Sequence, residues 1–230
     1  MLTLAEEFLL LALDDDTGRK SVDSTRMDAA VAGAAIVELT LEGALRLTEQ
    51  GDPDHKPGRL VATDRQPPDQ RLAKLVALAD SRKPKDAIGK VAGFGGWHSR
   101  ARNLQEALLK DLAAAGYLIE AKSKVLGVFP TTVWRQATPA FEAEILQRVR
   151  GAIVDDREID DRTAALISIL HAIDLLPKLL PDIDKRTVKR RGKQISDSEW
   201  GGPAVRKAVQ QVQAVTIAII VSTTSAVTSN

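Results

Sequence analysis

The chain has 230 residues, and 44% of them are hydrophobic. A chain of this length can bury a core as one large domain or as two small ones. It contains no cysteine, which excludes disulfides, thiolate nucleophiles and sulfur-ligated metals. Lysine and arginine number 32 against 31 aspartate and glutamate residues, whereas proteins that coat nucleic acid are strongly basic. The composition predicts a soluble, cytoplasmic, mostly helical protein and argues against nucleic acid as its partner.

Two helices are predicted in the first part of the chain. Thr3 and Glu6 have the capping-box spacing, which favours a helix that begins there and ends in the polar turn at 14–18. A second helix is predicted over residues 25–42. It contains a run of small residues at 29–35, where another helix can approach closely.

A unit of helix, glycine and β-hairpin occurs twice. The predicted strands are 44–48 and 59–63 in the first copy, and 117–120 and 125–129 in the second. Gly43 and Gly116 suit the left-handed conformation that ends many helices. Lys122 and Lys124 are predicted to lie at the tip of the second hairpin. Basic tips on apolar stems are typical of a groove-probing wing or of a surface that contacts a membrane.

Further helices are predicted from capping residues and from the helical spacing of apolar side chains. They cover 69–80, a short segment after Pro84, 99–115, and segments that start at Thr138–Pro139, at Asp160 or Asp161, and at Gly201–Pro203. Pro177 is expected to kink or end the helix before it. The segment from Lys178 to Lys193 contains seven basic residues and two acidic ones. It indicates either a solvated helix face or a site for an anion or a partner.

No arrangement of residues indicates catalysis. The three histidines, His55, His98 and His171, lie in different predicted elements, and none has a second ligand at zinc spacing. A glycine-flanked nucleophilic serine, a phosphate-binding loop and a dinucleotide fingerprint are absent. The acidic pairs at 155–156 and 160–161 flank a helix start, where carboxylates favour the helix dipole. We therefore expect a non-enzymatic protein with no metal and no cofactor.

The sequence also predicts that no segment crosses a membrane. The longest apolar stretch, 214–221, is far shorter than the roughly 20 residues that span a bilayer. The amino terminus lacks the basic region and the cleavage site of a signal peptide. Any association with a membrane is therefore expected to be peripheral.

Four segments together resemble one known family in their order and spacing. They are 2–13 with the acidic turn and Gly18 that follow, 33–43, 109–118 and 161–166. The family is that of Golgi phosphoprotein 3 (GPP34), and the similarity covers nearly the whole chain. The chain looks like a bacterial member, because its alanine-rich second half differs most from the eukaryotic proteins. The resemblance implies a mainly α fold, with a single helical domain over 1–222, a helical core, two short β-hairpins and a disordered tail at 223–230.

The resemblance further implies binding to phosphatidylinositol 4-phosphate on a membrane surface and a hairpin that can mediate oligomerisation. In the family the headgroup is held by a tryptophan and an arginine near the second helix and by two arginines three residues apart. The corresponding positions here are Asp23, Ala32, Arg102 and Gln105, so only Arg102 matches. Arginine forks supply much of the affinity for phosphate. We therefore expect little preference for this lipid over other anionic lipids.

The predicted headgroup-binding residues are Arg100, Arg102, Lys122 and Lys124. The second hairpin is predicted to contact a membrane, or to form a homo-oligomer, through Val125, Leu126, Val128, Phe129, Trp134 and Arg135. Arg102 has an alternative role as a helix-surface residue paired with Glu106 at i,i+4. The alternative for Phe129 and Trp134 is that both rings pack against the core.

The leading hypothesis is a peripheral, non-enzymatic protein that binds anionic phospholipid headgroups at the inner face of the membrane. One alternative is a winged-helix-like nucleic-acid binder, because a wing is also built from a helix, a glycine and a basic hairpin. The other is an oligomeric scaffold whose hairpins bury each other. Convergence of Arg102, Lys124, Arg135 and the basic segment 185–193 on one face would favour docking, whereas scatter would favour solvated charge.

Overall fold

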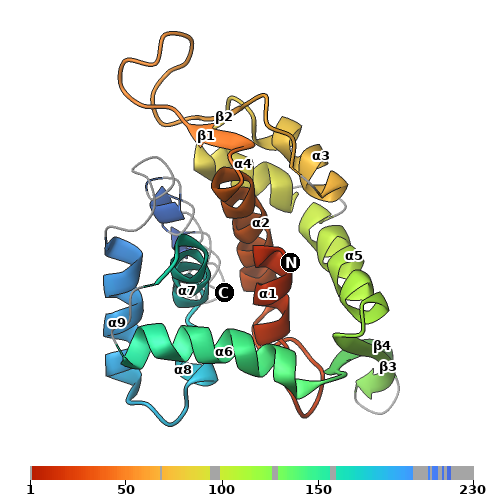
Figure 1. Ribbon diagram of the computed structural model, residues 1–230. Helices are drawn as coiled ribbons and strands as arrows, with labels where there is room; N and C mark the ends of the chain where they lie inside the picture. Colours follow the sequence, from red (N-terminus) through yellow and green to blue (C-terminus); the bar gives the residue numbers. More distant parts are fainter. Residues whose placement is uncertain are drawn as a thin grey trace, which may run out of the picture.

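The computed structural model describes residues 2–67, 69–93, 99–125, 129–155 and 159–198, with a few later positions at 207, 209–211, 214 and 217–218. Within these residues the chain is mainly α-helical and has two small antiparallel sheets of two strands each (Figure 1). The predicted fold class is thus confirmed. The predicted tail at 223–230, and most of the predicted last helix, lie outside the described residues.

Two helices, α1 (Leu4–Leu11) and α2 (Ser24–Leu41), form the centre of the molecule, and the other helices surround them (Figure 1). Every residue of α1 is buried, because apolar side chains occur on all sides of this helix and need partners in every direction. In α2 the residues from Met27 to Thr40 are buried. The small residues in this stretch let neighbouring helices pack closely.

The predicted starts of both central helices are confirmed. The Thr3 N–H donates to Glu6 Oε2 at 2.7 Å and the Glu6 N–H donates to Thr3 Oγ1 at 3.3 Å, which is the predicted capping box. Asp23 caps α2, because its Oδ1 accepts from the Arg26 N–H at 3.0 Å. Such bonds satisfy amide groups that have no partner inside the first turn of a helix.

The first hairpin and two short helices cover one end of α2. Strands β1 (Leu45–Leu47) and β2 (Leu60–Ala62) pair antiparallel at the top of Figure 1. Helices α3 (Gln70–Ala79) and α4 (Pro84–Ala92) follow. All four elements agree with the predicted ranges.

The second hairpin follows α5 (Arg100–Ala114) and differs from its prediction. Strand β3 (Leu118–Val125) pairs with β4 (Phe129–Gln136) through eight consecutive residue pairs. The prediction of a strand over 125–129 was wrong, because Val125 ends β3 and Phe129 begins β4. Lys122 and Lys124 lie inside β3, opposite Thr132 and Pro130, and not at the tip.

The remaining helices form the other side of the molecule. They are α6 (Pro139–Val154), α7 (Asp161–Ala172), α8 (Leu176–Leu179) and α9 (Lys185–Asp197). Asp160 caps α7, as predicted, by accepting from the Thr163 N–H at 2.6 Å. Helix α7 ends at Ala172, before Pro177, which lies in the first turn of α8. Helix α9 packs against α7 and α8 at Gly192, where an added Cβ would lie 2.7 Å from Leu176 Cδ1.

Within the described residues, no helix combines the length and the apolar character needed to cross a bilayer.

Candidate functional site

The predicted basic residues lie along α5 and on the second hairpin, which together form the right side of Figure 1. Arg100 and Arg102 are exposed in the first turn of α5, and Lys122 is exposed on β3. The Arg100 Nη1 donates to the Lys90 carbonyl oxygen at 3.2 Å. Among the described residues Arg102 forms no ion pair, so the alternative pair with Glu106 is not observed. Arg102 therefore keeps its charge on the surface.

The predicted contact residues of the second hairpin have different environments. Trp134 is only 8% exposed and belongs to the hydrophobic core, so its ring offers little surface to a membrane. Arg135 is exposed. Among the hairpin residues whose exposure the structure describes, Ile119 is an exposed apolar side chain; it is 54% exposed and pairs with Arg135 across the strands. Val125 and Phe129 are placed in the strands, whereas Leu126 and Val128 lie outside the described residues.

The four positions that correspond to the headgroup pocket of the family do not form an open site. Ala32 and Gln105 are both 0% exposed. Asp23 serves as the cap of α2. Arg102 is the one of the four that presents a cation to solvent. Two of the four positions therefore offer no side chain to a ligand at the surface.

The buried side chain of Gln105 is part of a chain of hydrogen bonds. Lys20 Nζ donates to Gln105 Oε1 at 2.5 Å, and Gln105 Nε2 donates to Asp28 Oδ1 at 2.6 Å. The Ser99 hydroxyl completes the chain by donating to Asp28 Oδ2 at 2.9 Å. Burial lowers the pKa of Lys20, while the nearby carboxylate of Asp28 opposes this effect. Lys20 therefore brings a positive charge, from a distant segment, to a position where the family carries arginine.

Beside Lys20 a cleft of about 670 Å³ opens between α5, the loop that joins α1 to α2, and strand β4. Its lining combines four chemical types of side chain. The cations are Arg19, Lys20 and Lys110, and the carboxylates are Glu106 and Glu120. Leu13, Leu109 and Trp134 give it an apolar floor, and Thr131 and Thr132 add hydroxyl groups. Except for Trp134, none of these residues was singled out from the sequence as a site.

The loop that carries Arg19 and Lys20 is held tightly against β4. The Trp134 N–H donates to the Gly18 carbonyl oxygen at 2.8 Å. Gly18 has φ +65°, and an added Cβ would lie 2.8 Å from the Trp134 carbonyl oxygen. Asp15 of the same loop accepts from Gln136 Nε2 at 2.6 Å. These contacts fix the loop backbone from which the Arg19 and Lys20 side chains extend.

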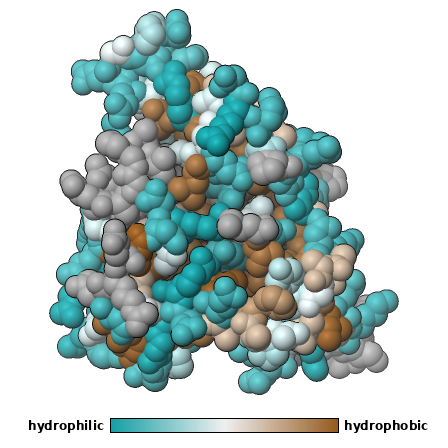
Figure 2. Space-filling model, viewed as in Figure 1, coloured by the Kyte–Doolittle hydropathy of each residue, from teal (hydrophilic) through white to brown (hydrophobic). Residues whose placement is uncertain are grey.

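Figure 2 shows the distribution of apolar atoms on one face. Tan and brown atoms lie among hydrophilic ones at the lower right of the view, where Figure 1 places β3 and β4. This end of the molecule therefore combines apolar surface with the exposed cations described above.

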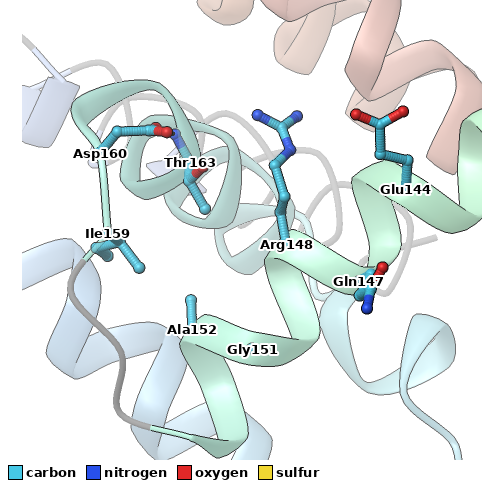
Figure 3. Close-up of a pocket in the computed structure, with 8 residues that line it drawn as sticks. All are labelled: Glu144, Gln147, Arg148, Gly151, Ala152, Ile159, Asp160 and Thr163. Atoms are coloured by element: carbon cyan, nitrogen blue, oxygen red, sulfur yellow. The ribbon is translucent and has the colours of Figure 1, made fainter.

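A second cleft, of about 300 Å³, lies between α6 and the start of α7 (Figure 3). Arg148 and Glu144 point to one side of α6 and Gln147 points away. Two of its charged groups already have partners: Arg148 Nη2 lies 3.0 Å from Glu7 Oε1, and Asp160 caps α7. This cleft is therefore a less suitable binding site for a charged ligand.

An acidic hollow of about 590 Å³ lies next to the start of α7. Its carboxylates are Glu38, Glu42, Asp160 and Asp161, with Arg162 among them. Arg162 Nη1 lies 2.9 Å from Glu38 Oε1 and neutralises it. Burial, and then the charge of Glu38, raise the pKa of Glu42. Within the described residues no group of three or more potential metal ligands is present.

The basic segment 185–193 does not converge with the other cations. It lies in α9, at the left of Figure 1, whereas α5 and the second hairpin lie at the right with α1 and α2 between them. Several of its charges have local partners: Lys189 Nζ lies 2.8 Å from Asp174 Oδ1, and Lys193 Nζ lies 2.5 Å from Asp197 Oδ2. This scatter favours solvated charge as the role of the α9 segment, and the candidate site comprises only α5, the 13–22 loop and the second hairpin.

The comparison with known protein families agrees with this architecture. The family model of Golgi phosphoprotein 3 (GPP34) matches residues 4–212, which is most of the chain and includes every element described above. The chain belongs to the Golgi phosphoprotein 3 (GPP34) family.

Proposed function

We propose that this protein is a non-enzymatic, peripheral membrane protein that binds anionic phospholipid headgroups on the cytoplasmic side. The observation that carries the proposal is the gathering of Lys20, Arg100, Arg102, Lys110 and Lys122 around α5 and the elements packed against it. Each basic residue near an anionic surface contributes about 1 kcal/mol of attraction. Several of them on one side of the molecule therefore favour docking to an anionic surface.

The second hairpin supports docking with an apolar contact. Ile119 is 54% exposed and lies beside Arg135. An apolar side chain next to a cation suits the boundary between headgroups and acyl chains. Ile119 thus takes the role that the sequence suggested for Trp134. A second copy of the chain could cover the same side chain, and the mass of the protein in solution, measured by light scattering, distinguishes the two contacts.

The test is co-sedimentation with vesicles of phosphatidylglycerol and of phosphatidylcholine at low and high salt. We expect binding to the anionic vesicles only, with a steep loss as salt shortens the screening length. The variant Arg100→Gln/Arg102→Gln/Lys122→Gln is expected to bind at least about tenfold more weakly. Its matched control is Lys185→Gln/Arg186→Gln/Arg190→Gln, which removes three exposed cations of α9 on the opposite side.

Two results would contradict the proposal. One is that both triple variants bind equally, because the docking end would then be misassigned. The other is a gel shift of random duplex DNA at the same salt with an affinity above that for anionic vesicles, which would favour the nucleic-acid alternative.

The burial of two of the family's headgroup positions bears on lipid selectivity. Because Ala32 and Gln105 are 0% exposed, fixed donors for one phosphate position are missing from those sites. We therefore expect less than about tenfold preference, or about 1.4 kcal/mol, for phosphatidylinositol 4-phosphate over other anionic lipids at equal surface charge. A larger preference would mean that other residues have rebuilt the pocket.

A further inference from the structure

We propose that the cleft between α5, the 13–22 loop and β4 binds a ligand that carries both a phosphate and a primary ammonium group, as phosphoethanolamine does. As a statement about a lipid, this inference rests on the proposed function, because docking would bring a headgroup to the cleft. As a statement about chemistry, it rests only on the side chains that line the cleft.

The first argument concerns the phosphate group. Lys20 and Lys110 reach the cleft from two different segments, and the Thr131 and Thr132 hydroxyls lie on its β4 side. A lysine ammonium has three N–H donors, and Lys20 uses one of them on Gln105. Lys110 is exposed and has no ion-pair partner among the described residues. Both ammonium groups therefore have N–H donors left for a phosphate bound in the cleft.

The second argument concerns the carboxylates. Glu106 and Glu120 line the same cleft and, in the described part of the chain, neither is engaged in an ion pair. A purely anionic ligand would be repelled by them, so a site evolved only for phosphate gains nothing from their presence. Ionised carboxylates are acceptors only. A primary ammonium, which is donor only, complements both of them.

The third argument concerns the floor of the cleft. Leu13, Leu109 and Trp134 are each at least nine-tenths buried and contribute apolar surface beneath the charged groups. Charges beside a low-dielectric wall attract each other more strongly than charges in open water. The short methylene link between phosphate and ammonium can lie on this apolar surface while each charged end meets its partners.

The geometry also predicts a direction of selectivity. A trimethylammonium group has no N–H donors, so it cannot hydrogen-bond to Glu106 and Glu120. A glycerol headgroup has no positive charge to offer them. The cleft should therefore prefer ethanolamine over both choline and glycerol headgroups.

The experiment measures binding of the full chain to soluble glycerophosphoethanolamine, glycerophosphocholine and glycerophosphoglycerol by calorimetry or NMR titration. Wild-type protein is expected to bind the ethanolamine compound at least about tenfold more tightly, a difference of about 1.4 kcal/mol. Glu106→Gln/Glu120→Gln should abolish this preference, and Lys110→Met should weaken binding of the ethanolamine compound. Equal binding of the three compounds by wild type would overturn the inference.

Two controls keep the result interpretable. Glu49→Gln and Lys185→Met remove one exposed charge of each sign far from the cleft and should leave the preference unchanged. Lys20→Met is a less safe variant, because it also removes the donor to buried Gln105. Lys110→Met removes no such bond among the described residues. A loss of binding in this variant therefore cannot be ascribed to disruption of the Lys20–Gln105 hydrogen bond.

Vesicles separate this inference from the proposed function. Binding to anionic vesicles with no gain on adding phosphatidylethanolamine, and no preference for the soluble ethanolamine compound, would leave the proposed function standing and defeat this inference. Preference for the soluble compound without vesicle binding would support the chemistry of the cleft, identify a free ligand as its source, and defeat the proposed function. A gain in both assays identifies the lipid headgroup as the ligand.

Discussion

Two regions of the molecule mix positive and negative side chains, and they do so in opposite ways. At the start of α1, Arg162 Nη1 lies 2.9 Å from Glu38 Oε1 and its Nε lies 3.4 Å from Glu7 Oε1. The Leu4 N–H also donates to Glu38 Oε2 at 2.7 Å. In the cleft beside α5, by contrast, Lys110, Glu106 and Glu120 face a hollow without pairing to one another.

The difference shows that neighbouring positive and negative side chains can either stabilise the fold or be available to a ligand. A buried charge must be paired, because removing it from water costs several kcal/mol. The α1 network is therefore part of the fold, and it leaves little capacity for a ligand. Charges around a solvent-filled cleft need no partner within the protein, so they are available to bind a ligand. The predictions below test the two regions separately.

The largest effect is expected for Arg162→Met. Loss of the guanidinium would leave Glu38 buried without its cationic partner and Glu7 with Arg148 alone, and breaking a buried ion pair in this way costs about 3–5 kcal/mol. Urea unfolding measures the loss as a lower midpoint. Arg186→Met, on the exposed face of α9, is the control and should change stability by less than about 0.5 kcal/mol. Equal effects of the two variants would mean that the network is not structural.

The next effect concerns pH. Burial, followed by the nearby carboxylate of Asp15, raises the pKa of Glu142 to about 8. The folded state thus holds this proton more tightly than the unfolded state. Glu142 therefore stabilises the fold most at pH values below the ordinary glutamate pKa. The free energy of unfolding falls as pH rises toward 8, by an amount on the order of 2–3 kcal/mol. Thermal melts from pH 5 to pH 8 measure the slope.

Glu142→Gln is the matching variant, because it keeps the shape of the side chain and removes the titration. Its melting temperature should depend less on pH than that of wild type over the same range. The same slope in both proteins would show that Glu142 titrates normally and does not influence the loop that carries Asp15.

The smallest of the three effects on stability is expected for Gly18→Ala. An alanine would have to adopt φ +65°, and its Cβ would lie 2.8 Å from the Trp134 carbonyl oxygen. Such strain costs on the order of 1–2 kcal/mol. The loop with Arg19 and Lys20 should shift, so ligand binding in the cleft should weaken together with stability. Gly58→Ala also places alanine at positive φ, +75°, but with open space around the Cβ, and it controls for backbone strain alone.

Much of the helical structure could be predicted because its signals are local. The Thr3–Glu6 capping box, the Ser99 cap and the Asp160 cap each act within one turn of a helix, so the sequence contains both partners of the bond. The second hairpin was harder. Lys122 and Lys124 look like turn residues in the sequence, but cross-strand pairing with Thr132 and Pro130 keeps them in β3. That pairing depends on residues beyond the turn, which local polarity does not indicate.

The sequence by itself determined the family, the helical class of the fold and the loss of three of the four headgroup positions, because these follow from local pattern and from collinear motifs. Only the tertiary structure decided that Lys20 bonds to Gln105, 85 positions later, and that Trp134 is buried while Ile119 is exposed. Only the tertiary structure also separated α9 from α5 (Figure 1). The physical reason is that burial and charge pairing depend on which helices pack together. Packing brings together residues that are far apart in the sequence, and no regular spacing marks them as neighbours.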